Sequence, residues 1–424
     1  MKEEHLKKAS QLDANDQLAK FRSEFHIPQK DGKDCIYLCG NSLGLQPKRT
    51  SEYVNEELKN WQEKGVEGHF TGNKPWVSYH QNAKASLAKI VGANEHEVVA
   101  MNNLTTNLHL AMASFYRPNG KRTKILIEKG AFPSDFYAVH SRIEVSGYDP
   151  KTNLIELDSP DKSNYLSTEE IIQKINELGD ELALVMFPGV QYYTGQFFDI
   201  KKITEAAHSI GAYAGFDLAH AVGNVPLHLH DHQADFAVWC TYKYLNSGPG
   251  GVGGLFIHEK HGKNKNMPRL SGWWGHDAEA RFKMNNQINP IPTVDGWQLS
   301  NVNILSHASH LASLSVFDEA GIENLRAKSL ELTNLMEKLV LNSEVLKNQI
   351  KILTPSKHEE RGAQLSLFLI NHGKSIFNYL IEHGCILDWR EPNVIRVAPV
   401  PLYNTFTDVV NFVSILEEAI SNEG

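Results

Sequence analysis

The chain has 424 residues, an apolar fraction of 41%, a charged fraction of 22% and a formal net charge of −8. This composition is typical of a globular protein and excludes the disordered, collagen-like and disulfide-rich classes. A mildly acidic chain whose Lys and Arg residues are spread out is a poor candidate for binding nucleic acid or anionic membranes, so we expect neither partner.

The N-terminal segment lacks the apolar core of a signal peptide, and no apolar run reaches the roughly 18 residues that a membrane helix needs. Four cysteines occur, and none of them forms a C-x-x-C pair. They are Cys35, Cys39, Cys240 and Cys385. We therefore expect a cytoplasmic protein with free thiols.

Short apolar runs alternate with helical stretches, which is typical of a βαβ architecture. The candidate strands are 98–101, 124–128, 182–187, 213–216, 236–240 and 254–258. Most of them lack polar–apolar alternation, as strands covered on both faces do. Ser167 and Glu170 predict a capping box, with the helix stopping at Gly179, and a second helix is expected between Asp199 and Gly211. The predicted fold is α/β, with a large, mainly parallel seven-stranded sheet.

The pattern changes after about residue 300. A long helical region over roughly 303–345 leads into a smaller α+β segment, with strands expected at 363–370 and 394–399 and a final helix from about Thr407. We expect three units. Residues 1–50 form an N-terminal arm that joins the small domain, 51–305 form the large domain, and 306–424 form the small C-terminal domain.

Two polar side chains follow neighbouring apolar strands. Asp217 ends one run, and Lys243 follows the next one between two tyrosines. Ligands bind at the carboxyl edge of open α/β sheets, and a lysine in an apolar setting is suited to Schiff-base formation. A lysine bound to pyridoxal phosphate needs an acid that keeps the pyridine nitrogen protonated, so the pair predicts this cofactor. The alternatives are a helix-capping Asp217 and a surface Lys243.

Further cofactor contacts are expected where helices begin. The hydroxyl of Thr105, next to Leu104, lies at the start of a predicted helix that would bind phosphate, although a simple helix cap would look the same. Phe132 is placed to cover one face of the ring, and Ser134 and Asp135 are placed to bond its polar edge.

Two further patterns carry weaker signals. Glycines 248, 250 and 253 match G-x-G-x-x-G, but the following run reads as a strand, so we expect a glycine-rich hairpin. Three alternating histidines, His228, His230 and His232, are of a residue type that commonly binds metal ions. Because no further ligand cluster accompanies them, we expect a polar loop and no metal.

Several segments together resemble the kynureninase family, which has the fold-type I (aspartate aminotransferase-like) architecture of pyridoxal-phosphate enzymes. They are 40–45 (GNSLGL), 132–135 (FPSD), 215–224 (GFDLAHAVGN), 242–246 (YKYLN), 272–276 (GWWGH) and 396–404 (RVAPVPLYN). The resemblance covers nearly the whole chain in order, and the combined set is highly specific.

The resemblance implies pyridoxal 5'-phosphate as a Schiff base on Lys243, with Asp217 at the pyridine nitrogen. The catalytic residues it implies are Lys243, Tyr242 and Asp217. The implied cofactor-binding set is Leu104, Thr105, Phe132, Pro133, Ser134, Asp135, Asp217, His220, Tyr242, Lys243, Trp273 and Asn301. The family supplies Trp273 and Asn301 from a second subunit, so a homodimer with shared sites is implied. Pro188 departs from the family pattern, where a serine is frequent.

The implied substrate is a small amino acid, whose α-carboxylate Arg396 would bind, with Ser42 in the same site. His69, Ser300 and Asn301 resemble the set in members that prefer 3-hydroxykynurenine. The implied reaction hydrolyses L-kynurenine, 3-hydroxy-L-kynurenine or both to anthranilate or 3-hydroxyanthranilate plus L-alanine. This reaction belongs to tryptophan catabolism by the kynurenine pathway and can feed NAD biosynthesis.

Two rival readings remain open. One is a related fold-type I enzyme, either a class V aminotransferase or a cysteine desulfurase, which would need a reactive Cys on a mobile loop. The other is a cofactor-binding regulator or a catalytically silent relative. A regulator would carry a DNA-binding domain, and no basic helix-turn-helix segment precedes this fold.

Overall fold

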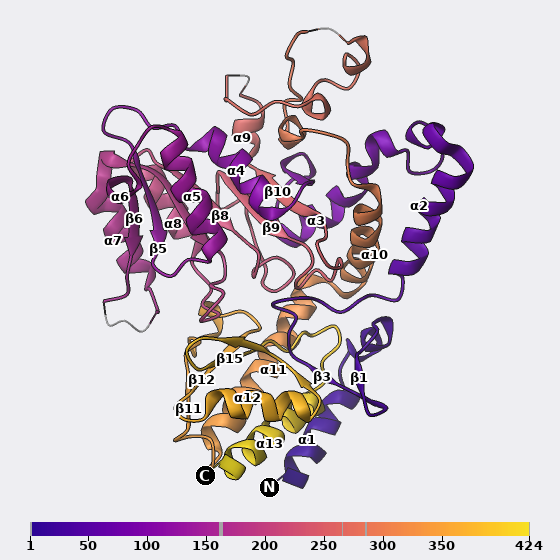
Figure 1. Ribbon diagram of the computed structural model, residues 1–424, viewed down its shortest axis with the longest axis vertical. Helices are drawn as coiled ribbons and strands as arrows, with labels where there is room; N and C mark the ends of the chain where they lie inside the picture. The colour runs from indigo at the N-terminus through magenta and orange to yellow at the C-terminus, as the bar shows by residue number, and fades with distance from the viewer. Residues whose placement is uncertain (1, 161–163, 265, 285, 424) are drawn as a thin grey trace.

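The computed structural model describes residues 2–160, 164–264, 266–284 and 286–423. Figure 1 shows a larger unit around one wide sheet and a smaller unit below it, where both chain ends lie. In these described ranges, no helix combines the length and the apolar character needed to cross a lipid bilayer.

Among the described residues, seven strands form the large sheet in the order β4-β10-β9-β8-β7-β5-β6. Their bounds are β4 Val98–Ala100, β5 Lys124–Glu128, β6 Leu154–Leu157, β7 Leu182–Pro188, β8 Tyr213–Asp217, β9 Phe236–Cys240 and β10 Gly253–Ile257. Strand β10 runs antiparallel to both of its neighbours, and the pairs from β9 to β6 are parallel. The predicted mainly parallel sheet is confirmed, and the glycine-rich segment is a hairpin as expected.

Helices cover both faces of this sheet. Their bounds are α2 Thr50–Lys64, α3 Lys84–Val91, α4 Leu104–Phe115, α5 Pro133–Val145, α6 Pro150–Asn153, α7 Thr168–Leu178, α8 Ile200–Ser209 and α9 Glu259–Gly262. Helices α4 and α5 share a core with Ile125 and Ile127, whereas Leu126 between them joins the core of α3, α7 and α8. Because successive side chains of a strand point to opposite faces, both sets must be apolar, and this explains the lack of alternation in the sequence.

The helix signals behave as predicted. The hydroxyl of Ser167 accepts a hydrogen bond from the backbone N–H of Glu170, and the carboxylate of Glu170 accepts one from the backbone N–H of Ser167. The helix ends at Gly179, whose positive φ of 50° suits glycine. One prediction was incomplete, because the region 303–345 is two helices, α10 Ile304–Ala320 and α11 Ile322–Asn342. Gly321, with φ at 75°, separates them.

The smaller unit has a four-stranded antiparallel sheet in the order β11-β12-β15-β14 among the described residues. The bounds are β11 Ile350–Ile352, β12 Leu365–Leu369, β13 Cys385–Ile386, β14 Asp388–Arg390, β15 Val394–Val397, α12 Gly373–Glu382 and α13 Phe406–Glu423. The predicted strands at 363–370 and 394–399 and the final helix are all present.

The N-terminal segment packs onto this smaller unit. It contains α1 Lys2–Ala14, β1 Gln29–Lys30, β2 Lys33–Asp34 and β3 Ile36–Tyr37. Helix α1 lies beside α13 at the bottom of Figure 1, and β3 pairs with β13. Ala9 and Leu38 are buried in the core that includes Val409 and Leu416 of α13. The N-terminal segment therefore packs on the smaller unit, in agreement with the expected arm. The domain boundaries at residues 50 and 305 stay predictions.

Candidate active site

The carboxyl edge of the large sheet carries the site. Asp217 is the last residue of β8, and Lys243 follows the end of the adjacent parallel strand β9. Helices α4 and α5 begin after β4 and β5 at the same edge, so four segments converge there. One pocket joins them. It is lined by Leu104, Thr105, Glu128, Phe132, Ser134, Asp135, Pro188, Val190, Tyr192, Asp217, Ala219, His220, Tyr242 and Lys243.

Lys243 reaches into this pocket with its amine. The Nζ atom lies 3.1 Å from Nε2 of His220, and it lies over the rings of Phe132 and Tyr242 at 5.8 Å and 5.9 Å. Burial and the nearby charge of Lys243 lower the pKa of His220 well below its usual value. His220 is therefore a neutral imidazole whose Nε2 accepts from the amine.

Two carboxyl groups meet opposite the lysine. Asp217 and Asp135 are both buried and hydrogen-bond to each other, and Asp217 also accepts from the backbone N–H of Ala219 at 2.7 Å. Burial raises the pKa of both groups, and the charge of Asp217 raises that of Asp135 further. Asp135 therefore holds the shared proton and donates it to Asp217, which keeps the charge.

The other end of the pocket lies between two helix starts. Thr105 Oγ1 at the start of α4 lies 2.8 Å from Ser134 Oγ at the start of α5. Asn103 caps α4 by accepting from the N–H of Thr106, and Pro133 occupies the first turn of α5. Pro133 itself does not line the pocket. Helix N-termini with free hydroxyls form an anion site.

Arg396 lies beside the pocket and is 1% exposed. Its Nη1 donates to the carbonyl oxygen of Tyr192 at 2.6 Å, and its Nη2 donates to Ser42 Oγ at 3.3 Å and to Asp388. Its Nε is buried without a partner. Asp388 is the cross-strand neighbour of Arg396 and also binds Arg390 at 2.9 Å. The structure thus brings Arg396 and Ser42 together, whereas their role at a substrate carboxylate stays a prediction.

Sequence reasoning missed Asp388, Tyr192 and Glu128. Tyr192 follows β7, and its ring meets the ring of Phe132 edge-on at 5.3 Å. The only signal for Asp388 is its place at the start of a short strand next to that of Arg396. Glu128 ends β5 in the way that Asp217 ends β8, and this position was a usable signal.

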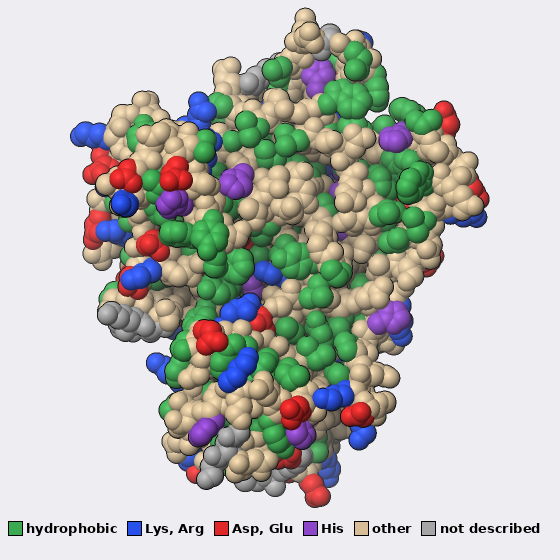
Figure 2. All heavy atoms as spheres, in the orientation of Figure 1, with side chains coloured by type: hydrophobic (Ala, Val, Ile, Leu, Met, Phe, Trp, Pro, Cys, Tyr) green, Lys and Arg blue, Asp and Glu red, His purple; other side chains and the backbone are tan. Residues whose placement is uncertain are grey.

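Besides Pro133, Ser42 and Arg396, four more predicted residues do not line the pocket of their own chain. Trp273, Ser300 and Asn301 are exposed, and His69 is half-buried. The His69 ring lies tilted against Phe70, Phe70 meets Phe282, and Phe282 meets Trp273, with ring centroids 5.5–6.1 Å apart. Hydrophobic side chains gather on this part of the surface in Figure 2. Trp273 also lines a cavity of about 400 Å³ in the loop that follows α9.

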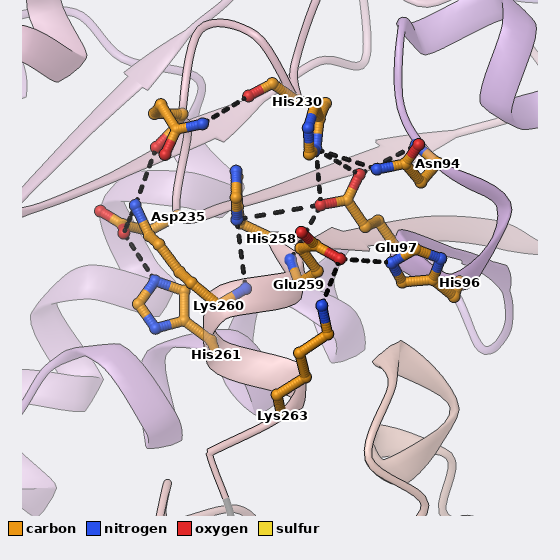
Figure 3. A network of polar contacts seen from close by, with 11 residues as sticks. Asn94, His96, Glu97, His230, Asp235, His258, Glu259, Lys260, His261 and Lys263 are labelled. Atoms are coloured by element: carbon orange, nitrogen blue, oxygen red, sulfur yellow. Dashed lines mark hydrogen bonds and ion pairs between the residues drawn. The ribbon is translucent and has the colours of Figure 1, made fainter.

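Figure 3 shows the polar network around His230, one of the three alternating histidines. His230 lies with Glu97 and His258, and one ligand atom from each lies within 4.8 Å of the others. The Glu97 oxygens already accept from the N–H groups of Asn94 and Glu259 and from His230. The rings of His230 and His258 stack at 12° to each other, which does not let one ion lie in both ring planes. Glu97 acts here as a capping carboxylate.

The thiols bear on the desulfurase alternative. All four cysteines are free and buried. Burial raises the pKa of each of the four thiols, which disfavours the thiolate that a nucleophilic cysteine needs.

Comparison with solved structures shows the fold. A cysteine desulfurase from Thermococcus onnurineus superposes with a TM-score of 0.74 at 17% identity, covering 92% of this chain and 95% of that one. A C-DES variant with glycine covalently linked to its PLP cofactor gives 0.76 at 17% identity over 91% and 96%. The predicted fold-type I architecture is confirmed.

Sequence comparison is more specific. Residues 325–416 match the family model described as the kynureninase C-terminal domain. Curated relatives named kynureninase include those of Flavobacterium psychrophilum, 52% identical over 98% of both chains, and of Christiangramia forsetii, 50% identical over 97% of both. One from Xanthomonas oryzae pv. oryzae is 51% identical over 96% of this chain and 97% of its own. Since these identities extend over nearly the full length, the chain belongs to the kynureninase family.

Proposed function

We propose that the pocket around Lys243 hydrolyses the Cβ–Cγ bond of kynurenine with pyridoxal phosphate as cofactor. The products are L-alanine and anthranilate, or 3-hydroxyanthranilate from the hydroxylated substrate. The observation that supports this most is the meeting of Lys243, Asp217 and two helix starts in one pocket of a chain of this family. The reaction is a step of tryptophan catabolism.

The residues present fit this cofactor. The pocket offers an amine, a charged carboxylate and hydroxyls at two helix starts, which match an aldehyde, a pyridine nitrogen and a phosphate. Asp135 Oδ1 and His220 Nδ1 are buried polar atoms without partners, as expected where a polar ligand belongs. Phe132 at the pocket mouth suits the ring face.

When bound, pyridoxal phosphate supplies an electron-withdrawing ring that stabilises charge at the substrate Cα. Lys243 holds the cofactor and, once displaced by the substrate amine, removes and returns the proton at Cα. Asp217 carries the charge that keeps the pyridine nitrogen protonated. Tyr242 lies beside Lys243, and burial raises the pKa of its hydroxyl, so it is protonated at neutral pH and donates a hydrogen bond to the Cγ oxygen.

Water supplies the oxygen that becomes part of the aromatic acid. It adds to the Cγ carbonyl, the Cβ–Cγ bond breaks, and Cβ takes a proton to give alanine. Arg396 binds the α-carboxylate, for which its free Nε provides an unused donor, and Ser42 lies beside it. Polar His69, Ser300 and Asn301 suit the extra hydroxyl of 3-hydroxykynurenine, which is the preferred substrate in this proposal.

We propose that His69, Ser300 and Asn301 reach the site from a second copy of the chain, because none of them lines the pocket of its own chain. A homodimer is supported by the exposed aromatic cluster of Phe70, Trp273 and Phe282, since large apolar side chains gathered on a surface mark contact sites. A cytoplasmic location is part of the same proposal and agrees with the four free thiols.

The first test is incubation of the pyridoxal-phosphate-loaded protein with L-kynurenine and with 3-hydroxykynurenine. Alanine release is measured together with fluorescence of the aromatic acid. Release of both products in equal amounts supports the reaction, and the ratio of kcat/KM values gives the preference. Cofactor binding without product would reject the reaction.

The shared site is tested by mixing two variants of low activity, Lys243→Ala and a triple variant in which His69, Ser300 and Asn301 are all changed to alanine, after the activity of each has been measured alone. Random exchange of subunits leaves one intact site in each hybrid dimer, so roughly a quarter of the native activity should return. If the mixture stays as inactive as its components while hybrids form, each chain has its own complete site.

A further inference from the structure

Glu128 is a pocket residue without an assigned role. It is the last residue of β5, its side chain is 3% exposed, and it lines the same pocket as Lys243 and Asp217. Sequence reasoning missed it, although it ends an apolar strand as Asp217 does.

A negative charge on the carboxyl group of Glu128 would have few hydrogen-bond or ion-pair partners to stabilise it. Its hydrogen bond is a long one of 3.4 Å from Nε2 of Gln191, whose own oxygen accepts from the N–H groups of Tyr193 and Thr194. In the part of the chain that the structure describes, no ion pair reaches Glu128. An unpaired buried carboxylate costs several kcal/mol, so the group takes a proton instead. Burial raises the pKa of Glu128 to about 8.

Glu128 also lies between two cavities. Glu128 and Tyr192 line both the pocket and a second cavity of about 240 Å³. That cavity is polar, with Ser159 and Asn164 in its lining. Tyr192 carries the carbonyl that holds Arg396. Tyr192 therefore links the cofactor pocket to Arg396 of the predicted carboxylate site.

We propose that Glu128 is a further cofactor-binding residue that works as an uncharged carboxylic acid and donates a hydrogen bond to a polar atom of the bound cofactor. This rests on the proposed cofactor. The charged and titratable groups around Glu128 are Asp135, Asp217, Tyr192, His220, Tyr242 and Lys243 in the pocket, and Lys129, Asp158 and Tyr193 in the second cavity. With Glu128 and Asp135 both protonated, Asp217 is the one carboxylate that faces the cofactor ring.

The first test uses the protein without cofactor, so that it does not depend on the reaction. Between the unfolded pKa near 4.5 and the folded pKa of about 8, the folded state holds a proton that the unfolded state has lost. The free energy of unfolding therefore falls as pH rises through this window. Glu128→Gln removes the effect, so its Tm relative to the native protein should increase steadily from pH 5 to pH 8.5.

A matched control is Glu156→Gln, which changes an exposed residue of the neighbouring strand β6 that pairs with Ile127. Its Tm difference from the native protein should not change over the same range. A Glu128→Gln difference that is equally flat would overturn the proposal, because Glu128 would then titrate alike in the folded and unfolded states.

The second test measures the Kd of pyridoxal phosphate at pH 7. Glu128→Gln keeps a neutral donor, so its Kd should stay close to the native value, whereas Glu128→Ala should bind about two- to tenfold more weakly. Equal weakening in both variants would mean that a charged Glu128 is needed and would overturn the proposal. A native Kd in Glu128→Ala would also overturn the proposal for Glu128, but it would leave the proposed function intact. If the native protein did not bind pyridoxal phosphate, the proposed function itself would be rejected.

Discussion

The amine nitrogen of Lys243 lies 3.1 Å from Nε2 of His220, and the other nitrogen of that imidazole has no partner. The two residues come from successive strand ends, and the neutral imidazole can only accept from the amine. His220 thus orients Lys243 toward the rings of Phe132 and Tyr242.

We predict that Lys243→Ala abolishes turnover of both kynurenines, because no other amine of the pocket can hold the cofactor and move the Cα proton. The measurement is alanine release by the loaded variant, with circular dichroism to check the fold. Lys201→Ala, a change of an exposed lysine on α8, is the control and should keep native activity. Native turnover by Lys243→Ala would reject the assignment of the site.

The site residues at the strand ends could be predicted because an apolar run and a polar side chain directly after it occur together there. Asp217 and Lys243 each follow an apolar run, and parallel strands place such residues at one edge. The edge strand β6 was not predicted because it has no continuous apolar run: its residues are half-buried or exposed and include Glu156. An edge strand buries less apolar surface, so its sequence resembles a loop.

Pairing between distant segments could not be read from local patterns. Strand β3 pairs with β13, although the two lie near opposite ends of the sequence. Each has only two residues, which are too few for a periodic pattern. The partner of Arg396 was hidden for the same reason, because Asp388 lies opposite it only after β14 and β15 pair. Glu128 was overlooked because an acid at a strand end is usually solvated, and its burial depends on the loop around Gln191.

We predict that Arg396→Lys raises KM for kynurenine by about 10- to 100-fold, with a smaller change in kcat. A charge-assisted hydrogen bond is worth roughly 1.5–3 kcal/mol, and lysine cannot provide the planar pair of donors. Steady-state kinetics at fixed pH measure both constants. Arg117→Lys, at an exposed position, should leave KM unchanged. An unchanged KM in Arg396→Lys would place the substrate carboxylate elsewhere.

We predict that Ser300→Ala lowers kcat/KM for 3-hydroxykynurenine about two- to tenfold more than for kynurenine, the range of one neutral hydrogen bond. The reason is that the proposed contact involves only the extra ring hydroxyl. Paired assays of the two substrates measure the ratio. Asn371→Ala, exposed in the smaller unit, is the control and should not change it. An equal loss on both substrates would mean that Ser300 does not read the hydroxyl.

The network around Asp235 gives a prediction about stability. Asp235 is buried and accepts from Nε2 of His208 at 2.8 Å, from Nε2 of His261 at 2.7 Å and from the N–H of Ala214 at 2.8 Å. Figure 3 shows it beside the Glu97 cluster. Burial alone would raise the pKa of Asp235, but the hydrogen bonds from His208 and His261 outweigh it and hold the pKa well below the usual range.

Because the folded pKa is depressed, the stabilisation is fully present above the unfolded value near 3.8 and is lost as pH falls through the folded value. We expect Asp235→Asn to lower the free energy of unfolding by about 3 kcal/mol at pH 7, the cost of breaking a buried charge pair. The deficit should shrink as pH falls from the unfolded value near 3.8 toward the much lower folded value, because the unfolded state takes up its proton first. Urea unfolding at pH 7 and at pH 2 measures both values. A deficit of the same size at the two pH values would show that Asp235 stabilises the fold through its shape and not through its charge.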